Sequence, residues 1–191
     1  GSVNVFAPSN IPLASCGAFI LWFGWFGFNA GSTLDASNTH LASIALNTML
    51  AGASAGTSAL LFSIGKYGKA DPSLTINGVL SGLVAITAGC AYVSEWSAII
   101  IGAVSGIIVI YATLFIDNLK IDDPVGAVAV HGFNGVFGTI AVGLFDSTQG
   151  LLTTGHFYLL GVQLLGSIVV ITWGLISGTV IAKVAEKTVG F

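Results

Sequence analysis

The sequence predicts an all-α membrane protein, a bundle of about six transmembrane helices. Of its 191 residues, 54% are hydrophobic and only 7% are charged, and the mean hydropathy is +0.95. Soluble domains carry about 25% charged residues, so these charges are too few to cover a water-facing surface. Six apolar segments follow one another, each near the ~20 residues that a spanning helix needs. The lysines lie only in alternate connections or after the last segment.

The six predicted helices make up a single transmembrane domain over residues 1–191. Residues that favour helix starts mark several boundaries: Asn10 precedes the first segment, Asp71 the third and Ser94 the fourth. Asp123 precedes Pro124, which we expect to be the first helical residue of the fifth. Membrane strands would be about ten residues long and alternating, unlike these runs. The predicted bounds are 11–31, 40–65, 74–93, 96–116, 124–145 and 156–182.

The positions of the lysines predict the orientation of the chain. In the six-span arrangement all of them fall on one side of the membrane: Lys66, Lys69, Lys120, Lys183 and Lys187. The connections on the other side hold no Lys or Arg. Because positive residues favour the cytoplasmic side, we expect a multi-pass protein of the cell membrane with both ends of this chain in the cytoplasm.

The composition also argues against several functions. The chain has no arginine and no basic run, so we expect no nucleic-acid partner. Cys16 and Cys90 both lie in apolar segments, which predicts buried thiols and not a disulfide framework. We expect no cofactor, no metal ion and no enzymatic activity.

Small and polar residues within the segments predict how the helices pack. Small residues let helices approach closely in lipid, and they form two stripes: Ala51, Gly52, Ala55 and Gly56 in the second segment, and Gly132, Gly135 and Gly138 in the fifth. We expect Asn47 and Gln163, which lie within spans, to make hydrogen bonds between helices.

His131 is the strongest functional candidate. It lies seven residues beyond Pro124, about 10 Å along a helix, which places it within the hydrocarbon layer. Ionisable side chains at that depth are costly and are usually functional. The alternative is a neutral imidazole that bonds to a neighbouring helix.

An aromatic and polar stripe ends the first segment. Trp25, Phe28, Asn29 and Ser32 stand at positions i, i+3, i+4 and i+7, so we expect them to share one helix face near the outer surface. Aromatic rings beside an amide and a hydroxyl suit a small cation. An interfacial aromatic belt also fits the rings, and the pattern alone does not choose between the two.

One short motif is compatible with an enzyme. Residues 52–56, Gly-Ala-Ser-Ala-Gly, match G-x-S-x-G, and His131 could serve Ser54 as a base, as in a rhomboid-like intramembrane serine protease. All five residues are small and lie within a longer small-residue stripe, without the strand-to-helix turn of a nucleophile elbow. The protease is therefore the weaker interpretation.

Three segments resemble the Amt/Mep/Rh ammonium transporter family. They are LWFGWFGFNAGS at 21–32, NGVLSGLVAITAGCAYV at 77–93 and KIDDPVGAVAVHGFNGVFGTIAVGLF at 120–145, in family order. The resemblance implies a monomer of eleven spans with two halves of inverted topology. This chain resembles spans six to eleven, that is, the second half plus the final helix.

The resemblance also implies residue roles. Trp25 and Ser32 would help to recruit ammonium at the outer surface, and Phe28 would be one of two stacked gate residues. His131 would be one of two paired pore histidines, and Asn29 would have a supporting role.

The remaining expectations concern what lies outside these residues. The other histidine and gate residue belong to the family's first half, spans one to five. We therefore expect a fragment or one polypeptide of a split transporter. Ammonium or ammonia, methylammonium, the lipid bilayer, a homotrimer of the complete protein and a cytoplasmic PII-type regulator are the implied partners. An ammonium sensor of the same fold is the alternative.

Overall fold

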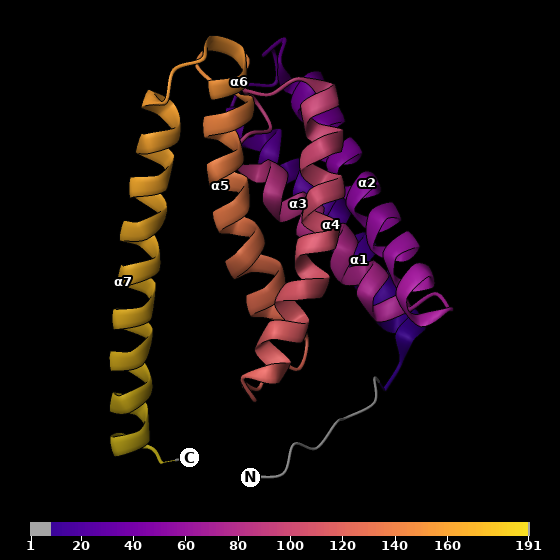
Figure 1. Cartoon of the computed structure of the whole chain (residues 1–191), viewed down its shortest axis with the longest axis vertical. Helices are drawn as coiled ribbons and strands as arrows, with labels where there is room; N and C mark the ends of the chain where they lie inside the picture. The colour runs from indigo at the N-terminus through magenta and orange to yellow at the C-terminus, as the bar shows by residue number, and fades with distance from the viewer. Residues whose placement is uncertain (1–8, 191) are drawn as a thin grey trace.

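The computed structural model describes residues 9–190, which fold into a helical bundle (Figure 1). Besides helices, the described residues contain an isolated antiparallel bridge between Val93 and Asp146. The elements in chain order are α1 (Ile11–Asn29), the 3₁₀ turn η1 (Gly31–Thr33), α2 (Leu41–Tyr67), α3 (Pro72–Thr87), α4 (Glu95–Asn118), the π-helix η2 (Val128–Phe133), α5 (Asn134–Phe145), α6 (Leu151–Thr154) and α7 (Tyr158–Thr188).

Five stretches of the described chain are long and apolar enough to cross a bilayer: α1 with η1, α2, α4, η2 with α5, and α7. Helix α3 is apolar too, but its 16 residues extend only about 24 Å, less than the ~30 Å of the hydrocarbon layer. The predicted polytopic helical bundle is confirmed, and the chain is a multi-pass membrane protein.

Three predicted helix starts are confirmed by side-chain caps. The side chains of Asn10, Asp71 and Ser94 each accept a hydrogen bond from the N–H three residues further on, at 2.9, 3.0 and 3.3 Å. Each bond satisfies one of the N–H groups that the first turn of a helix leaves without a partner. The local sequence therefore determines where α1, α3 and α4 begin.

The centre of the bundle is the contact among α2, α3 and α4, which small residues make possible. A Cβ added at Gly102 of α4 would collide with the backbone of Ala51 of α2, and one at Gly106 with that of Ala55. Close approach matters because van der Waals packing drives helix association in lipid. The predicted stripe of α2 lies at this contact, and all of its members are buried: Ala51, Gly52, Ala55 and Gly56.

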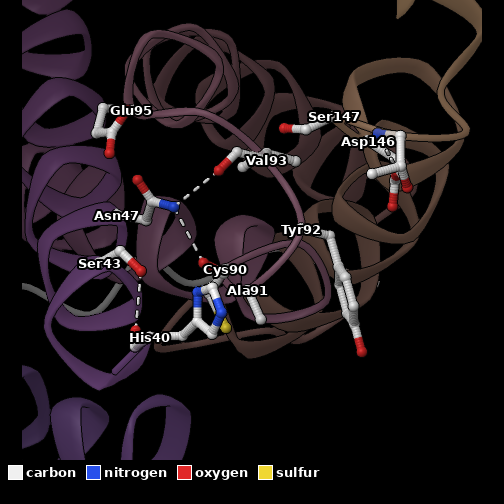
Figure 2. A pocket seen from close by; sticks show the side chains of 11 residues that line it. His40, Ser43, Asn47, Cys90, Ala91, Tyr92, Val93, Glu95, Asp146 and Ser147 are labelled. Carbon is white, nitrogen blue, oxygen red and sulfur yellow. Dashed lines mark hydrogen bonds between the residues drawn. The ribbon is translucent and has the colours of Figure 1, made fainter. Parts of the chain in front are cut away.

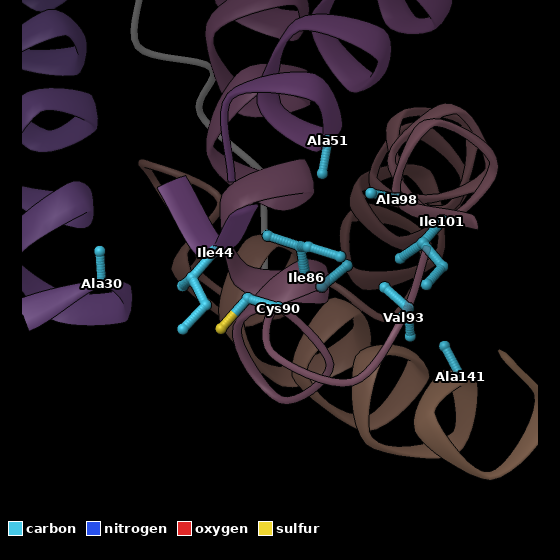
Figure 3. Packing of buried hydrophobic residues seen from close by; sticks show 10 residues of the cluster. Ala30, Ile44, Ala51, Ile86, Cys90, Val93, Ala98, Ile101 and Ala141 are labelled. Atoms are coloured by element: carbon cyan, nitrogen blue, oxygen red, sulfur yellow. The ribbon is translucent and has the colours of Figure 1, made fainter. Parts of the chain in front are cut away.

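Apolar side chains complete the core near the start of α4. Ile86 of α3 and Ile101 of α4 are buried in a cluster that also contains Ile44 and Cys90 (Figure 3). Cys90 therefore has the predicted buried position. Cys16 does not, because it lies on the exposed surface of α1, which the described part of the chain leaves largely uncovered.

Helices α5 and α7 lie to one side of this core, with α7 outermost in Figure 1. A Cβ at Gly138 of α5 would collide with the backbone of Ala85 of α3, as the predicted stripe requires. The other two glycines make no such close contact within the described chain, since a Cβ at Gly132 or Gly135 would meet only a valine methyl, at the ordinary contact distances of 3.5 and 3.9 Å. For these two positions the close helix contact stays a prediction.

The third predicted helix, 74–93, ends earlier than expected, at Thr87. Residues 88–93 form turns, and Asn47 of α2 holds them (Figure 2). Its Nδ2 donates to the carbonyls of Cys90 at 3.0 Å and Val93 at 2.9 Å. These bonds satisfy carbonyls that a continued helix would have used itself. The predicted interhelical role of Asn47 is thus confirmed, whereas the side chain of Gln163 makes no hydrogen bond among the described residues.

The fifth predicted helix, 124–145, begins later than expected, at Val128, so Pro124 is not its first residue. Asp123 still caps it, because Oδ2 accepts from the N–H groups of Val128 at 3.0 Å and Ala129 at 3.3 Å. Gly126 makes the intervening turn possible with a left-handed φ of 72°. A Cβ there would also lie 2.7 Å from Nδ2 of Asn77, so the Asn77 side chain would have to shift.

Candidate functional site

Three of the predicted site residues lie together between α1 and η2. The ring of Trp25 lies nearly parallel to that of His131, with centroids 6.4 Å apart and planes at 16°. Phe28, one turn further along α1, meets Trp25 edge to face at 6.0 Å and 87°. Both distances are in the range in which aromatic rings attract one another. The fold therefore brings the end of the first predicted segment to the histidine of the fifth.

A hydrogen bond fixes the orientation of the Trp25 indole. Its Nε1 donates to Oγ1 of Thr87 at 2.9 Å, and this hydroxyl donates in turn to the carbonyl of Leu83 at 2.7 Å. The indole N–H is therefore already used. What Trp25 can offer a ligand is the face of its ring, whose negative potential attracts cations.

Ser32 lies beyond the end of α1, in η1. Its hydroxyl donates to the carbonyl of Phe28, and the side chain is exposed. Because that bond uses the hydroxyl proton, the lone pairs of Oγ are left to accept hydrogen bonds from a donor in solution. A cation that carries N–H donors would find an acceptor here.

Asn29 does not share the face of Phe28, contrary to the helical-stripe prediction. Phe28 is 60% exposed and Asn29 only 6%. The amide of Asn29 points to α2, where Nδ2 donates to Oγ1 of Thr48 at 3.0 Å. The two residues are neighbours in sequence and therefore about 100° apart around the helix, and packing against α2 turns the Asn29 side toward the core. A buried bond of this kind contributes about 1 kcal/mol and ties the end of α1 to α2.

His131 stands in the π-helix η2, a wide turn that the sequence analysis did not predict. Such turns are rare and occur frequently at functional sites. The imidazole is exposed in the described chain. Asn134 closes the wide turn: it is fully buried, and its Nδ2 donates to the carbonyl of Ala129 at 3.0 Å. Its Oδ1 is buried and has no hydrogen-bond partner among residues 9–190.

Ser54, the serine of the G-x-S-x-G match, lacks the histidine base that a catalytic serine needs beside it among the described residues. Oγ of Ser54 donates to the carbonyl of Ala51 in its own helix at 3.2 Å, and it lies against Gly102 of α4. His131 is stacked on Trp25 instead. The geometry supplies no reason to pair the two.

A separate polar cavity of about 260 Å³ lies among the start of α2, the turns of residues 88–93 and the end of α5 (Figure 2). His40, Glu95 and Asp146 are among its lining residues, and none of the aromatic site residues is. Burial by itself raises the pKa of Asp146, but hydrogen bonds from Thr148 and Gln149 outweigh it and hold the pKa below its ordinary value. Its Oδ1 accepts three of these bonds, each at 2.8 Å.

Sequence reasoning missed Thr87, Thr48 and Asn134. Each is a small polar residue within an apolar segment, and the sequence offers no periodicity that pairs it with the residue it serves. Thr87 and Trp25 in particular come from different helices. Asn134 lies three residues after His131 in sequence, and the residue type alone does not indicate that its side chain bonds to the turn that carries the histidine.

Comparison with known proteins identifies the family. The model of the ammonium transporter family matches residues 2–191. Ammonium transporter Amt2 of Archaeoglobus fulgidus is 40% identical over 201 residues, which cover all of this chain and 43% of that protein. Ammonium transporter 1 of Dictyostelium discoideum is 36% identical over 192 residues, 97% of this chain and 41% of that one.

Solved structures share the fold. A sensor Amt protein superposes with a TM-score of 0.92 at 42% identity, over all of this chain and 47% of its own. Mep2 of Candida albicans superposes with a TM-score of 0.90 at 32% identity, over 98% of this chain and 44% of its own. This chain thus spans less than half the length of each of these relatives. Because the alignments with the family model and with these relatives extend over nearly the whole chain, the chain belongs to the ammonium transporter family.

Proposed function

We propose that this chain forms one wall of a membrane pore that conducts ammonium or ammonia. Trp25 and Ser32 recruit ammonium at the outer end, Phe28 gates the entrance, and His131 lines the pore below. Asn29 supports them by anchoring the end of α1. The observation that carries the proposal is the grouping of Trp25, Phe28 and His131, whose rings lie within 6.4 Å of one another in succession.

The chemistry of each group suits the passage of this ion. A bare ammonium ion in an apolar pore loses its hydration, which costs many kcal/mol unless the charge is compensated or the proton removed. The ring faces and the Ser32 oxygen can compensate the charge at the entrance. Deeper in, desolvation favours neutral ammonia, since burial lowers amine pKa values by up to about 3–5 units. A neutral imidazole at His131 can accept or donate a hydrogen bond without a permanent charge.

The facing wall comes from the rest of the family fold, in the same polypeptide or in a second one. Phe28 and His131 are both exposed in the described chain. An exposed imidazole facing lipid would be costly, so the proposal requires a partner half that covers this face. We call this chain together with that half the assembled transporter. A homotrimer and a PII-type regulator are further expectations for it.

The orientation also belongs to the proposal. The lysines stand at or after the C-terminal ends of α2, α4 and α7: Lys66, Lys69, Lys120, Lys183 and Lys187. The positive-inside rule then makes these ends cytoplasmic and places Ser32 outside. The variants Ser32→Cys and Lys69→Cys test this in intact cells. Only the cysteine at position 32 should react with an impermeant maleimide.

His131→Ala tests the pore role. In proteoliposomes that contain the assembled transporter, the variant should abolish methylammonium uptake or change its selectivity. His156→Ala, which removes an exposed histidine before α7, is the matched control and should transport normally. Unchanged uptake and selectivity in His131→Ala would refute the proposed pore.

An ammonium sensor is the second candidate, because one of the solved structures with the same fold is a sensor Amt protein. A sensor needs the same recruitment residues but no flux. Ammonium binding to the assembled protein, without uptake by proteoliposomes, would favour the sensor. Uptake that follows the ammonium gradient would favour the transporter.

A further inference from the structure

We propose that Asn134 is a positioning residue for His131: its buried amide maintains the π-turn that holds the imidazole against Trp25. This inference rests on the proposed role of His131 in the pore. It deepens that proposal by naming the group that determines where the imidazole points.

The hydrogen bonds of the wide turn single out Asn134. In a regular π-helix, the N–H of residue 134 would donate to the carbonyl of Ala129, five residues back. Here that N–H donates to the carbonyl of His131, and the side chain of Asn134 donates to Ala129 instead, at 3.0 Å. The amide group thus completes the turn in place of the backbone.

The burial of the side chain points to the N–H donor as the part of the amide that matters at this position. Asn134 is fully buried, and within the described part of the chain its Oδ1 has no hydrogen-bond partner. Leaving a buried acceptor unpaired is unfavourable, and a leucine of similar size would avoid it. A polar residue that joined two helices would reach a neighbour, as Asn47 does. Asn134 reaches a carbonyl of its own wide turn, so its bond acts on the geometry around His131.

The consequence for His131 follows from helix geometry. A π-turn accommodates one residue more than an α-turn, and each residue of an α-helix is rotated by about 100° from the one before. If the wide turn closed into an α-helix, His131 would rotate away relative to α5. Its ring could then no longer keep the 16° and 6.4 Å relation to Trp25.

The direct test is the structure of the assembled transporter with Asn134→Leu, determined by electron cryomicroscopy. The variant removes the donor and the unpaired oxygen together, so folding should persist. We expect the turn to close and the ring centroids of Trp25 and His131 to separate beyond about 7 Å, outside the range of aromatic pairs. Thr139→Val, which removes an ordinary bond to the carbonyl of Gly135 in the same helix, should leave the pair in place. An unchanged pair in Asn134→Leu overturns the proposal.

A double-mutant cycle on methylammonium uptake separates positioning from general destabilisation. Asn134→Leu should lower Vmax roughly tenfold or more, and this loss should vanish when it is measured on the residual uptake that His131→Ala leaves; if His131→Ala leaves no uptake, the structure of Asn134→Leu decides alone. Losses that simply multiply in the double variant would overturn the proposal. If His131→Ala alone changes nothing, the pore proposal fails, while the structure of Asn134→Leu still decides whether Asn134 positions the ring.

Discussion

The indole of Trp25 and the imidazole of His131 lie nearly parallel, although one comes from α1 and the other from η2. One hydrogen bond orients the indole directly, and a second one acts on the turn that carries the imidazole. Thr87 of α3 accepts from the indole, and Asn134 supports the turn that carries the imidazole. The site is therefore a meeting of three parts of the bundle, and each support can be altered without touching the rings.

Thr87→Val should weaken recruitment more than transport rate. The change keeps the shape of the side chain but leaves the partly buried indole N–H of Trp25 without an acceptor. Losing about 1 kcal/mol of orientation should raise the KM for methylammonium roughly fivefold in the assembled transporter, with a smaller effect on Vmax. Thr57→Val, which removes a similar bond on the exposed side of α2, is the control. A KM equal to that of the control would show that Trp25 does not depend on Thr87.

Phe28→Ala should impair gating more than folding. The ring is 60% exposed and meets Trp25 only by its edge, so its removal costs the described chain little packing. We expect methylammonium uptake to change and a leak of K⁺ to appear in proteoliposomes, while the thermal transition stays in place. Phe23→Ala, at an 81% exposed position of the same helix, should show neither effect. Loss of expression without a change in selectivity would identify Phe28 as a packing residue.

Gly138→Ala should destabilise the bundle. The added Cβ would collide with the backbone of Ala85, and neither helix can move without disturbing the α3–α5 contact. Overpacking of this kind costs about 1–3 kcal/mol, measurable as a lower thermal transition in detergent. Gly135→Ala lies one turn away on α5, where the nearest atom is 3.9 Å from the new Cβ, and should be tolerated. Equal stability of the two variants would contradict the close contact.

The stability of the chain should depend on pH through Asp146. Its folded-state pKa is lowered, so its carboxylate contributes stability above the ordinary aspartate pKa and loses it as pH falls through the folded-state value. Asp146→Asn replaces bonds to a charged acceptor by bonds to a neutral one and should cost about 1 kcal/mol at pH 7. The difference in Tm between the two proteins should begin to shrink below about pH 4, where the unfolded chain takes up a proton at this aspartate, and should disappear once the folded carboxylate is protonated as well.

Asp35→Asn provides the comparison for that pH series. Hydrogen bonds from the hydroxyl and N–H of Ser37 lower the pKa of Asp35 as well, but the carboxylate is exposed and its bonds stay within one loop. Its replacement should leave Tm unchanged. A constant Tm difference for Asp146→Asn from pH 7 to pH 3 would argue against the charge of Asp146.

Much of the fold could be predicted from local signals. Asn10, Asp71 and Ser94 mark helix starts because a cap is an interaction over three residues, all of which the sequence displays. Gly102 and Ala51, by contrast, meet only because two helices cross there. The early end of α3 could not be predicted for the same reason, since Asn47 of another helix supplies the bonds that replace helical ones.

The sequence by itself determined that the chain lies in a lipid bilayer, that it is helical and which residues are candidates for the site. Hydropathy, caps and the motifs around Phe28 and His131 are properties of residues close together in sequence. Only the tertiary structure decided which candidates meet. It turned Asn29 toward Thr48, set Trp25 against His131 and opened the π-turn that Asn134 supports. These outcomes depend on contacts between helices that are distant in sequence. The helical period shows which residues share a face, but only packing decides which face of each helix meets a neighbour.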